Sequence, residues 1–363
     1  MACEVKIDLG ARSYPIWIGS GMLNRLPHAV EGRQGLLVTD AHVDACYGDR
    51  VLALLGAGWR NIVLPPGEAT KSAAQWSDLL EKIAAARVNR QGALVALGGG
   101  VVGDLTGFAA ATYMRGIRFI QVPTSLLAMV DSSVGGKTGI NLAAGKNLAG
   151  AFHQPVAVFA DTDTLATLPV REFAAGMAEV VKYGVALDAE FFGWLEQNVP
   201  AIQARTPAAL EKMVRRCCEL KAEVVAQDER EAGWRAVLNF GHTLGHALEQ
   251  VTHYSGLLHG EAVALGIPFA LAWSIETKGF SPKDAGRVVD LLHRFGLNIA
   301  QLKPTGLDWR ELRAAMERDK KAAGQAVRFV LCDRLGQCEL PEPIPGGNLD
   351  ELLKGWCQNG VGK

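Results

Sequence analysis

Histidines at helical spacing are the side chains of this sequence best suited to hold a metal. His242 and His246 are four residues apart, so both lie on one face if this segment is helical. Two imidazoles on one face are a common beginning of a metal site. His259 and the carboxylate of Glu179 are further candidates, and imidazole with carboxylate favours Zn²⁺ or another divalent first-row metal. We therefore expect a metal site drawn from these four residues.

A glycine-rich turn offers a second kind of site. Gly98–Gly103 reads Gly-Gly-Gly-Val-Val-Gly, follows the predicted strand Ala93–Leu97 and opens an apolar helix. Glycines let a pyrophosphate approach the backbone, and a helix N-terminus supplies free N–H groups. The acidic residue usual about 20 positions later is missing, so Asp40, after the predicted strand Gly35–Thr39, is the candidate for the ribose hydroxyls. The turn favours dinucleotide binding, with a tight packing turn as the alternative.

Basic side chains are repeatedly set among glycines and apolar residues. The segment Val134–Thr138 ends like a P-loop, but Asp131 stands where that motif needs glycine, and its carboxylate would repel a phosphate. Lys137 nevertheless suits a phosphate or carboxylate. Similar basic residues are Arg115, Lys146, Lys182, Lys221, Arg235 and the run Arg318–Lys321. Each alone is most simply a solvated surface charge, whereas together they would suit a substrate that carries both phosphate and carboxylate.

Composition narrows the class of protein. The chain has 363 residues, which at roughly 150 residues per domain predicts two domains, and its net charge of −1 gives no field to hold nucleic acid or an anionic membrane. Uncharged runs such as Ala262–Ile275 are shorter than the 18 or so residues of a membrane span. Its 7 cysteines include no Cys-x-x-Cys pair, and we expect free thiols. These observations predict a soluble cytoplasmic enzyme with a small-molecule substrate.

The elements that must position these residues change character along the chain. Short apolar runs that end in Asp, Pro or Gly predict buried parallel strands at Gly35–Thr39, Asn61–Leu64, Ala93–Leu97, Phe119–Val122 and Val156–Phe159. Glu4–Leu9 and Tyr14–Ile18 alternate like an antiparallel edge hairpin. After Leu168, helical periodicity predicts helices at 171–186, 207–227, 237–251, 260–277 and 282–295, and only 327–331 looks extended. The fold class is α/β plus all-α: a Rossmann-like parallel-sheet domain, 1–168, followed by a helical domain, 169–363.

Whole motifs make the chain resemble the 3-dehydroquinate synthase family of sugar-phosphate cyclases. The two most specific blocks are Met129–Asn141 and Asn239–His246. Further matching blocks are Pro66–Lys71, Gly98–Asp104, Val122–Ser125, Gly145–Asn147, Gly176–Lys182 and Leu258–Val263. The resemblance implies an N-terminal NAD-binding α/β domain and a C-terminal helical domain that binds metal and substrate.

The resemblance also implies a reaction. The substrate would be 3-deoxy-D-arabino-heptulosonate 7-phosphate, and the products 3-dehydroquinate and phosphate, in the shikimate pathway of aromatic amino acid biosynthesis. The family uses transient oxidation by NAD, phosphate elimination, re-reduction and an intramolecular aldol closure, with Zn²⁺ or Co²⁺ bound. It suggests a homodimer. The alternatives are another sugar-phosphate cyclase, or a metal-dependent alcohol dehydrogenase on the same fold.

Family roles are carried over position by position. The metal ligands would be Glu179, His242 and His259, so that His246, a ligand candidate on spacing alone, matches a catalytic histidine instead. The matching NAD contacts are Asp40, His42, Glu68, Lys71, Gly99, Gly100, Val101, Asp104, Thr124, Ser125, Lys137, Lys146, Thr164 and Thr167. The matching substrate or catalytic positions are Asp131, Lys137, Asn147, Lys182, Lys221, Arg235, Asn239 and Lys320. Glu231 would support the metal-bound region, and Arg115 would reach a neighbouring subunit's site. His42 and Ser125 depart from the commoner family residues, Asn and Thr.

Overall fold

The computed structural model describes residues 3–321 and 326–359. The chain divides into two compact units, Met1–Pro169 with Arg205–Arg230 and Val170–Ala204 with Glu231–Lys363. Each unit is described by itself below.

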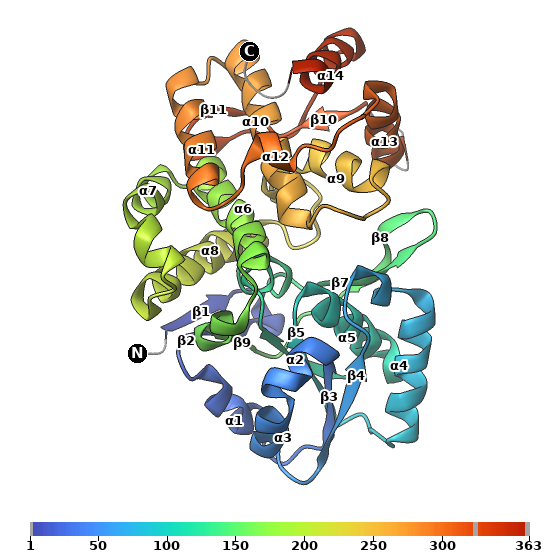
Figure 1. Ribbon diagram of the computed structural model, residues 1–363. Coiled ribbons are helices and arrows are strands. Elements are labelled where there is room, and N and C mark those ends of the chain that lie inside the picture. Colours follow the sequence, from blue (N-terminus) through green and yellow to red (C-terminus); the bar gives the residue numbers. More distant parts are fainter. Residues whose placement is uncertain (1–2, 322–325, 360–363) are drawn as a thin grey trace. The chain divides into compact units, whose positions relative to one another are not determined.

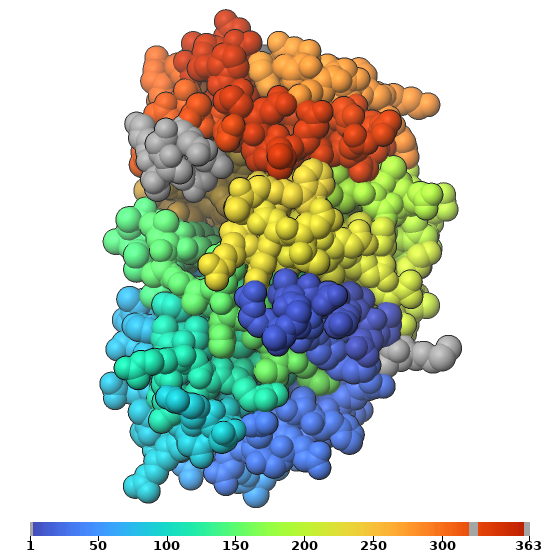
Figure 2. All heavy atoms as spheres, turned by 180° about the vertical axis from the view of Figure 1, so that it is seen from behind, coloured from blue at the N-terminus to red at the C-terminus, as the bar shows by residue number. Residues whose placement is uncertain are grey.

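A parallel sheet forms the centre of the first unit (Figure 1). Within the described residues it has seven strands in the order β1-β2-β9-β6-β5-β3-β4, where β1 runs antiparallel to β2 and the remaining neighbours are parallel. The strands are β1 (Cys3–Ile7), β2 (Tyr14–Gly19), β3 (Gly35–Asp40), β4 (Trp59–Leu64), β5 (Ala93–Gly98), β6 (Arg118–Pro123) and β9 (Val158–Asp161). The predicted edge hairpin and the five predicted parallel strands are confirmed. β1 is an edge strand, and the dark blue N-terminal residues lie at the surface in Figure 2.

Helices cover both faces of this sheet, which is why its central strands β3 and β5 are buried along almost their whole length. On β5, Val95 and Leu97 belong to a core with helix α1 and helix α3, while Leu94 and Ala96 belong to a core with α4 and α5. Successive side chains of a strand point to opposite faces, so one strand serves both cores. The helical segments of this unit are η1 (Gly10–Arg12), η2 (Met22–Arg25), α1 (Leu26–Val30), α2 (Ala41–Val43), η3 (Asp44–Gly48), α3 (Asp49–Leu55), η4 (Glu68–Thr70), α4 (Ala73–Ala85), α5 (Gly100–Thr112), η5 (Tyr113–Arg115), η6 (Ala128–Ser132), η7 (Thr162–Thr167) and α8 (Pro207–Gln227).

A hairpin in this unit was not among the predicted elements. β7 (Lys137–Leu142) and β8 (Gly145–Phe152) pair antiparallel, and β7 packs against α5. Gly139 and Gly150 lie opposite each other, and a Cβ on Gly150 would stand 2.1 Å from the carbonyl oxygen of Thr138. Glycine is weak in strands, so the pattern concealed this hairpin.

The second unit is mainly helical. Its helices are α6 (Val170–Leu187), α7 (Ala189–Gln203), η8 (Trp234–Asn239), α9 (His242–Val251), α10 (His259–Lys278), α11 (Pro282–Arg294), α12 (Ile299–Leu302), α13 (Trp309–Lys321) and α14 (Gly346–Asn359). Two short strand pairs join β10 (Arg328–Phe329) to β13 (Glu342–Pro343) and β11 (Cys332–Arg334) to β12 (Gln337–Cys338). Helix α10 is buried along most of its length and packs against α6, α9 and α11. No helix in the described residues is both long and apolar enough to cross a membrane.

The structure also differs from the sequence predictions in a domain boundary, in the start of one helix and in one pair of cysteines. The segment Arg205–Arg230 belongs to the first unit, whereas the predicted boundary placed it in the helical domain. The predicted helix 237–251 is interrupted, because Gly241 has φ of +79° and α9 begins only at His242. Cys332 and Cys338 face each other across β11 and β12 and form a disulfide, so the expectation of free thiols was wrong for this pair.

Candidate functional site

Helix α6 carries two charged side chains into the interior of the second unit. Glu179 and Lys182 are three residues apart on one helical face, with exposed fractions of 0% and 1%, and their side chains form an ion pair. Burying a carboxylate is costly unless opposite charges or hydrogen-bond donors meet it. Glu179 is therefore expected to face further positive or donor groups.

His242 lies next to Glu179 in the structure. It is the first residue of α9, directly after Gly241, whose left-handed backbone turns the chain into the helix. Its Nδ1 lies 3.2 Å from the carbonyl oxygen of Phe240, and its Nε2 lies 3.4 Å from Oε1 of Glu179. A carbonyl can only accept, so Nδ1 carries the proton and Nε2 offers its lone pair toward Glu179.

His259 also lies next to Glu179, and the start of α10 positions it. The side chain of Glu261 accepts a hydrogen bond of 2.8 Å from the backbone N–H of Leu258, which caps the helix. Arg171 holds both oxygens of Glu261, at 2.7 and 2.8 Å. Nε2 of His259 lies 3.6 Å from Oε1 of Glu179. Capped in this way, the helix directs the ring of its first residue at the buried carboxylate.

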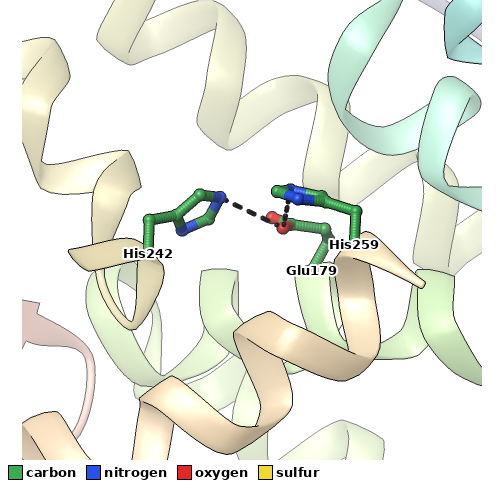
Figure 3. Close-up of side chains that lie close together, drawn as sticks. All are labelled: Glu179, His242 and His259. Atoms are coloured by element: carbon green, nitrogen blue, oxygen red, sulfur yellow. Dashed lines mark ion pairs between the residues drawn. The ribbon is translucent and has the colours of Figure 1, made fainter. Parts of the chain in front are cut away.

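The three side chains have the separations of metal ligands (Figure 3). Neither oxygen of Glu179 makes a hydrogen bond of good geometry within the described residues, and 3.4 and 3.6 Å are long for hydrogen bonds from ring nitrogens. Two ligand atoms on a tetrahedral Zn²⁺, with bonds of about 2.0–2.1 Å, stand about 3.3–3.4 Å apart. All the offered ligand atoms lie within 4.8 Å of one another. Glu179, His242 and His259 thus fit a divalent metal.

The pKa directions of this group favour that use. Burial opposes the charge of Glu179, but nearby positive charge, chiefly the ammonium group of Lys182, holds the pKa of this carboxyl well below its usual range. Burial lowers the pKa of His242. Burial would also lower the pKa of His259, but Glu179 and Glu249 outweigh it and raise that pKa to about 10. An ionised Glu179 and a neutral His242 are ready to bind, whereas a metal must displace a proton from His259.

Four further predicted residues of the second unit lie on α9 or before it, and they are His246, Asn239, Arg235 and Glu231. The His246 ring centroid is 5.3 Å from that of His242 and 6.0 Å from that of His259, and His246, Glu249 and His259 form a second group at metal-binding separation. Asn239 donates 2.7 Å to Glu231, and Arg235 is 2% exposed within η8. The side chain of Lys320, in α13, is outside the described part of the chain.

The predicted nucleotide turn lies in the first unit, where β5 meets α5. β5 ends at Gly98, and Gly99 precedes α5 without a side chain that could cap its N–H groups. A Cβ on Gly100 would stand 3.0 Å from Oγ of Ser132. The turn lies at the carboxyl ends of parallel strands, where open α/β sheets bind ligands. The N–H groups at this helix start are uncapped, and the glycines before them carry no side chains, so a phosphate can approach the backbone closely.

Predicted NAD contacts surround this edge of the sheet. Asp40 ends β3, and its Oδ1 accepts from the backbone of His42 at 2.9 Å, while the His42 side chain is exposed. Lys71 pairs with the side chain of Asp104, whose pKa is raised by burial against the charge of Lys71. Nζ of Lys146 lies 3.7 Å from the carboxylate of Glu68, and Val101 lies on α5. Thr124 is buried directly after β6, and Oγ of Ser125 accepts a hydrogen bond from the N–H of Ala128. Thr164 is buried and donates to the carbonyl of Asp161, and the hydroxyl of Thr167 lies 2.7 Å from that of Tyr47.

Predicted substrate contacts of the first unit lie on η6, α8 and the hairpin β7–β8. Nζ of Lys221, on α8, donates 2.6 Å to Oδ1 of Asp131 in η6. Lys137 begins β7 and is exposed. Asn147 in β8 has φ of +55°, and its backbone N–H donates 3.0 Å to Oδ1 of Asn141. Exposed Arg115 ends η5, where φ is positive at both Met114 and Arg115.

Comparison with known proteins identifies the family. The model of the 3-dehydroquinate synthase N-terminal domain matches residues 61–175, and that of the C-terminal domain matches residues 176–322. The chain belongs to the 3-dehydroquinate synthase family. The resemblance predicted from sequence is confirmed, and the chain is an enzyme of the cyclase type.

Individual members and relatives agree with this assignment. A 3-dehydroquinate synthase of Colwellia psychrerythraea is 45% identical over 96% of this chain and 99% of its own length. The solved structure of a 2-deoxy-scyllo-inosose synthase with carbaglucose-6-phosphate, NAD⁺ and Co²⁺ has a TM-score of 0.88 at 27% identity, covering 97% of this chain and 99% of its own. A Streptomyces hygroscopicus 2-epi-5-epi-valiolone synthase with NAD⁺ and Zn²⁺ has a TM-score of 0.87 at 26% identity, covering 94% and 96%.

Two residues that contact predicted site residues were not found from sequence. Glu249 lies 3.3 Å from Nδ1 of His259, and it follows His242 and His246 by seven and three residues, a spacing that would have placed it on their face. Asn141 donates 2.7 Å to Glu68 and accepts from Asn147, so it links two predicted contacts. No sequence spacing signals Asn141, because its partners come from different segments.

Proposed function

We propose that this member of the 3-dehydroquinate synthase family converts 3-deoxy-D-arabino-heptulosonate 7-phosphate to 3-dehydroquinate and phosphate. The observation that carries the proposal is the buried carboxylate of Glu179 facing Nε2 of His242 and of His259, 3.4 and 3.6 Å away, in a chain of this family. Relatives named 3-dehydroquinate synthase reach 45–49% identity, whereas the structures of cyclases named for other products reach 26–27%, which favours this substrate.

NAD would be held by the first unit. The uncapped turn Gly98–Gly100 would meet its pyrophosphate, and Asp40 the ribose hydroxyls. Bound there, NAD supplies reversible hydride acceptance and is not consumed. Lys71 and Asp104, paired beside the turn, would keep this surface in one arrangement, and Asn141 would fix Glu68.

Zn²⁺ or Co²⁺ would be held by Glu179, His242 and His259. Such an ion acts as a Lewis acid that lowers the pKa of a bound hydroxyl. Lys182 pairs with Glu179 and balances its charge in the interior. The ring of His246 lies near the rings of His242 and His259, and it would move the proton at one of its ring nitrogens.

Basic and amide side chains would bind the substrate. The heptulosonate carries a phosphate and a carboxylate, and charge-assisted hydrogen bonds from Lys and Arg are the strong contacts to both. Lys137, Asn147, Asp131 and Lys221 would contribute from the first unit. Lys182, Arg235, Asn239 and Lys320 would contribute from the second, with Glu231 holding the amide of Asn239.

The proposal extends to a homodimer in the cytoplasm. In the first unit, the apolar side chains of Met114, Leu148 and Phe152 are 44%, 56% and 43% exposed, and a second copy of the chain would bury them. The neighbouring Arg115 would then serve the partner subunit's site. The molar mass in solution tests the dimer, and cell fractionation tests the location.

The redox balance is the decisive experiment. The purified enzyme with metal is incubated with the heptulosonate 7-phosphate and substoichiometric NAD⁺, while phosphate and the absorbance of NADH are followed together. We expect many phosphates released per NAD⁺ without a steady rise in NADH, since the hydride is returned in each turnover.

Two other outcomes would contradict the proposal in different ways. Stoichiometric NADH without phosphate would instead indicate an alcohol dehydrogenase. Phosphate release from sedoheptulose 7-phosphate, but not from the heptulosonate, would keep the mechanism and change the substrate.

A further inference from the structure

Glu249 is a buried acidic side chain to which the proposed reaction gives no role. It lies on α9 with an exposed fraction of 3%, and its Oε2 is 3.3 Å from Nδ1 of His259. His259 belongs to a different helix, α10, so this contact joins two elements of the second unit. A buried carboxylate is costly to retain, and its partner here is one of the proposed metal ligands.

The two histidines of the metal group share one arrangement. Nδ1 of His242 lies 3.2 Å from the carbonyl of Phe240, and Nδ1 of His259 lies 3.3 Å from the carboxylate of Glu249. In each ring an acceptor at Nδ1 leaves Nε2 to face Glu179, at 3.4 and 3.6 Å. Metal-binding histidines commonly donate their other N–H to a carbonyl or carboxylate, which fixes the tautomer and the ring orientation.

We propose that Glu249 is a positioning residue, which holds the Nδ1–H of His259 so that Nε2 of this ring is presented toward Glu179. The inference rests on the metal site proposed above. Glu249 does not itself ligate the ion in this arrangement. The residue acts through His259, because without the carboxylate the ring can turn, which points Nε2 away from Glu179, or take the other tautomer, which places the proton on Nε2.

The experiment measures metal binding without turnover. The full chain is stripped of metal, Co²⁺ is titrated back in competition with a chelator, and the dissociation constant and visible absorption of the Co²⁺ form are recorded. Loss of a partner of this kind weakens metal binding by roughly 10- to 100-fold, and we expect that loss in Glu249→Leu. Glu249→Gln should lose less, because its amide oxygen can still accept from Nδ1–H, and its Co²⁺ spectrum should match that of the unchanged chain.

Two further variants separate positioning from charge and from general stability. Glu249→Asp keeps the charge but is one methylene shorter, so its affinity for Co²⁺ should fall as in Glu249→Leu. This variant also takes the place of Glu249→Leu if the leucine prevents folding. Glu196→Gln is the matched control, since Glu196 accepts from Arg287 of the same unit at 3.0 and 2.5 Å, apart from the three ligands. It should lower the melting temperature and leave the Co²⁺ constant unchanged.

The other possible outcomes contradict either the metal site or the positioning role of Glu249. If the unchanged chain binds no Co²⁺, the proposed metal site fails and the positioning role fails with it. If Co²⁺ binds with the same constant in Glu249→Leu or Glu249→Asp, only the positioning role fails. If Glu249→Gln loses as much affinity as Glu249→Leu and its spectrum changes, Glu249 is a direct ligand, as the grouping of His246, Glu249 and His259 would allow.

Discussion

The side chain of Glu179 shows how a single buried charge organises its surroundings. A carboxylate with no exposed surface has only its neighbours to replace water, and here they are one ammonium group and two imidazoles. A neutral histidine at 3.4 Å is a poor substitute for water, but it is well placed to share a cation with the carboxylate. The geometry therefore makes metal binding a means of stabilising Glu179 as well as a source of chemistry.

Histidine substitutions test which of the three rings bind metal and whether His246 has a catalytic role. We expect His242→Ala and His259→Ala to lose bound metal, because each removes one of the two nitrogens that face Glu179. His246→Ala should retain metal and lose most of its turnover. Elemental analysis of the purified variants and the rate of phosphate release measure the two effects. Metal loss in His246→Ala would instead favour the pairing of His242 with His246 that their spacing alone suggests.

The residue types of this group were predictable from the sequence, but the orientations of their side chains were not. The spacing of His242 and His246 and the presence of His259 and Glu179 were visible in the sequence. Which nitrogen of each ring faces the carboxylate depends on the Phe240 carbonyl and on Glu249, and such contacts arise only when η8, α9 and α10 are packed. Spacing alone therefore left His242 and His246 equal, whereas the fold brings His259 rather than His246 opposite His242 around Glu179.

Close helix packing brings together the elements that carry the proposed metal ligands. A Cβ on Gly260 would stand 1.9 Å from the carbonyl oxygen of Ala175 in α6, and one on Gly266 would stand 1.9 Å from that of Gly241 before α9. Backbone carbonyls of packed helices cannot move aside as a flexible side chain can. The absence of side chains at these two positions of α10 therefore permits the approach that places His259 beside Glu179.

Substitution of Gly260 tests this dependence. Gly260→Ala should lower the free energy of unfolding by about 1–3 kcal/mol or more, because overpacking must shift α10 or α6. The same shift should weaken Co²⁺ binding, since His259 is the adjacent residue. Thermal unfolding and the Co²⁺ titration measure both effects.

Gly286→Ala is the matched control for this substitution. It changes glycine to alanine within α11, where a Cβ meets nothing within 4 Å. This change should stabilise the chain by about 0.5–1 kcal/mol and leave Co²⁺ binding unchanged. Equal behaviour of the two variants would show that α10 does not need this glycine.

Secondary structure was predictable where apolar periodicity was strong, and less so where glycine decided the backbone. The parallel strands and α6, α8, α10 and α11 follow their hydrophobic patterns. The break before α9 depends on the left-handed Gly241 rather than on periodicity, and the hairpin β7–β8 depends on glycines that give no strand signal. α7 was also missed, although Asp188 caps it by accepting 2.9 Å from the N–H of Phe191.

At the scale of the whole molecule, helix α8 belongs to a different unit from the helices that precede it in sequence. This helix follows α6 and α7 along the chain, yet it packs against β1, β2, η6 and η7 of the first unit. Its buried face includes Leu210, Met213, Val214, Cys217 and Val225. A boundary drawn at residue 168 from the change of pattern could not show this, because periodicity reports that a helix has an apolar face and not which surface covers it.

The first unit should therefore fold well only when α8 is included. Residues 1–169 alone would leave exposed the surface that α8 covers, at a loss of roughly 1.5–3 kcal/mol for each large apolar side chain uncovered. A short Gly-Ser linker can join Pro169 to Arg205, because the guanidinium of Arg205 already donates 2.8 Å to the carbonyl of Leu168. We expect 1–169 to bind a hydrophobic dye and melt at low temperature or aggregate, and 1–169 linked to 205–230 to unfold cooperatively at a higher temperature.

A control in which Leu210, Met213 and Val214 of the linked protein become serine should behave like 1–169. Equal melting of the two fragments would show that α8 does not belong to the core of the first unit.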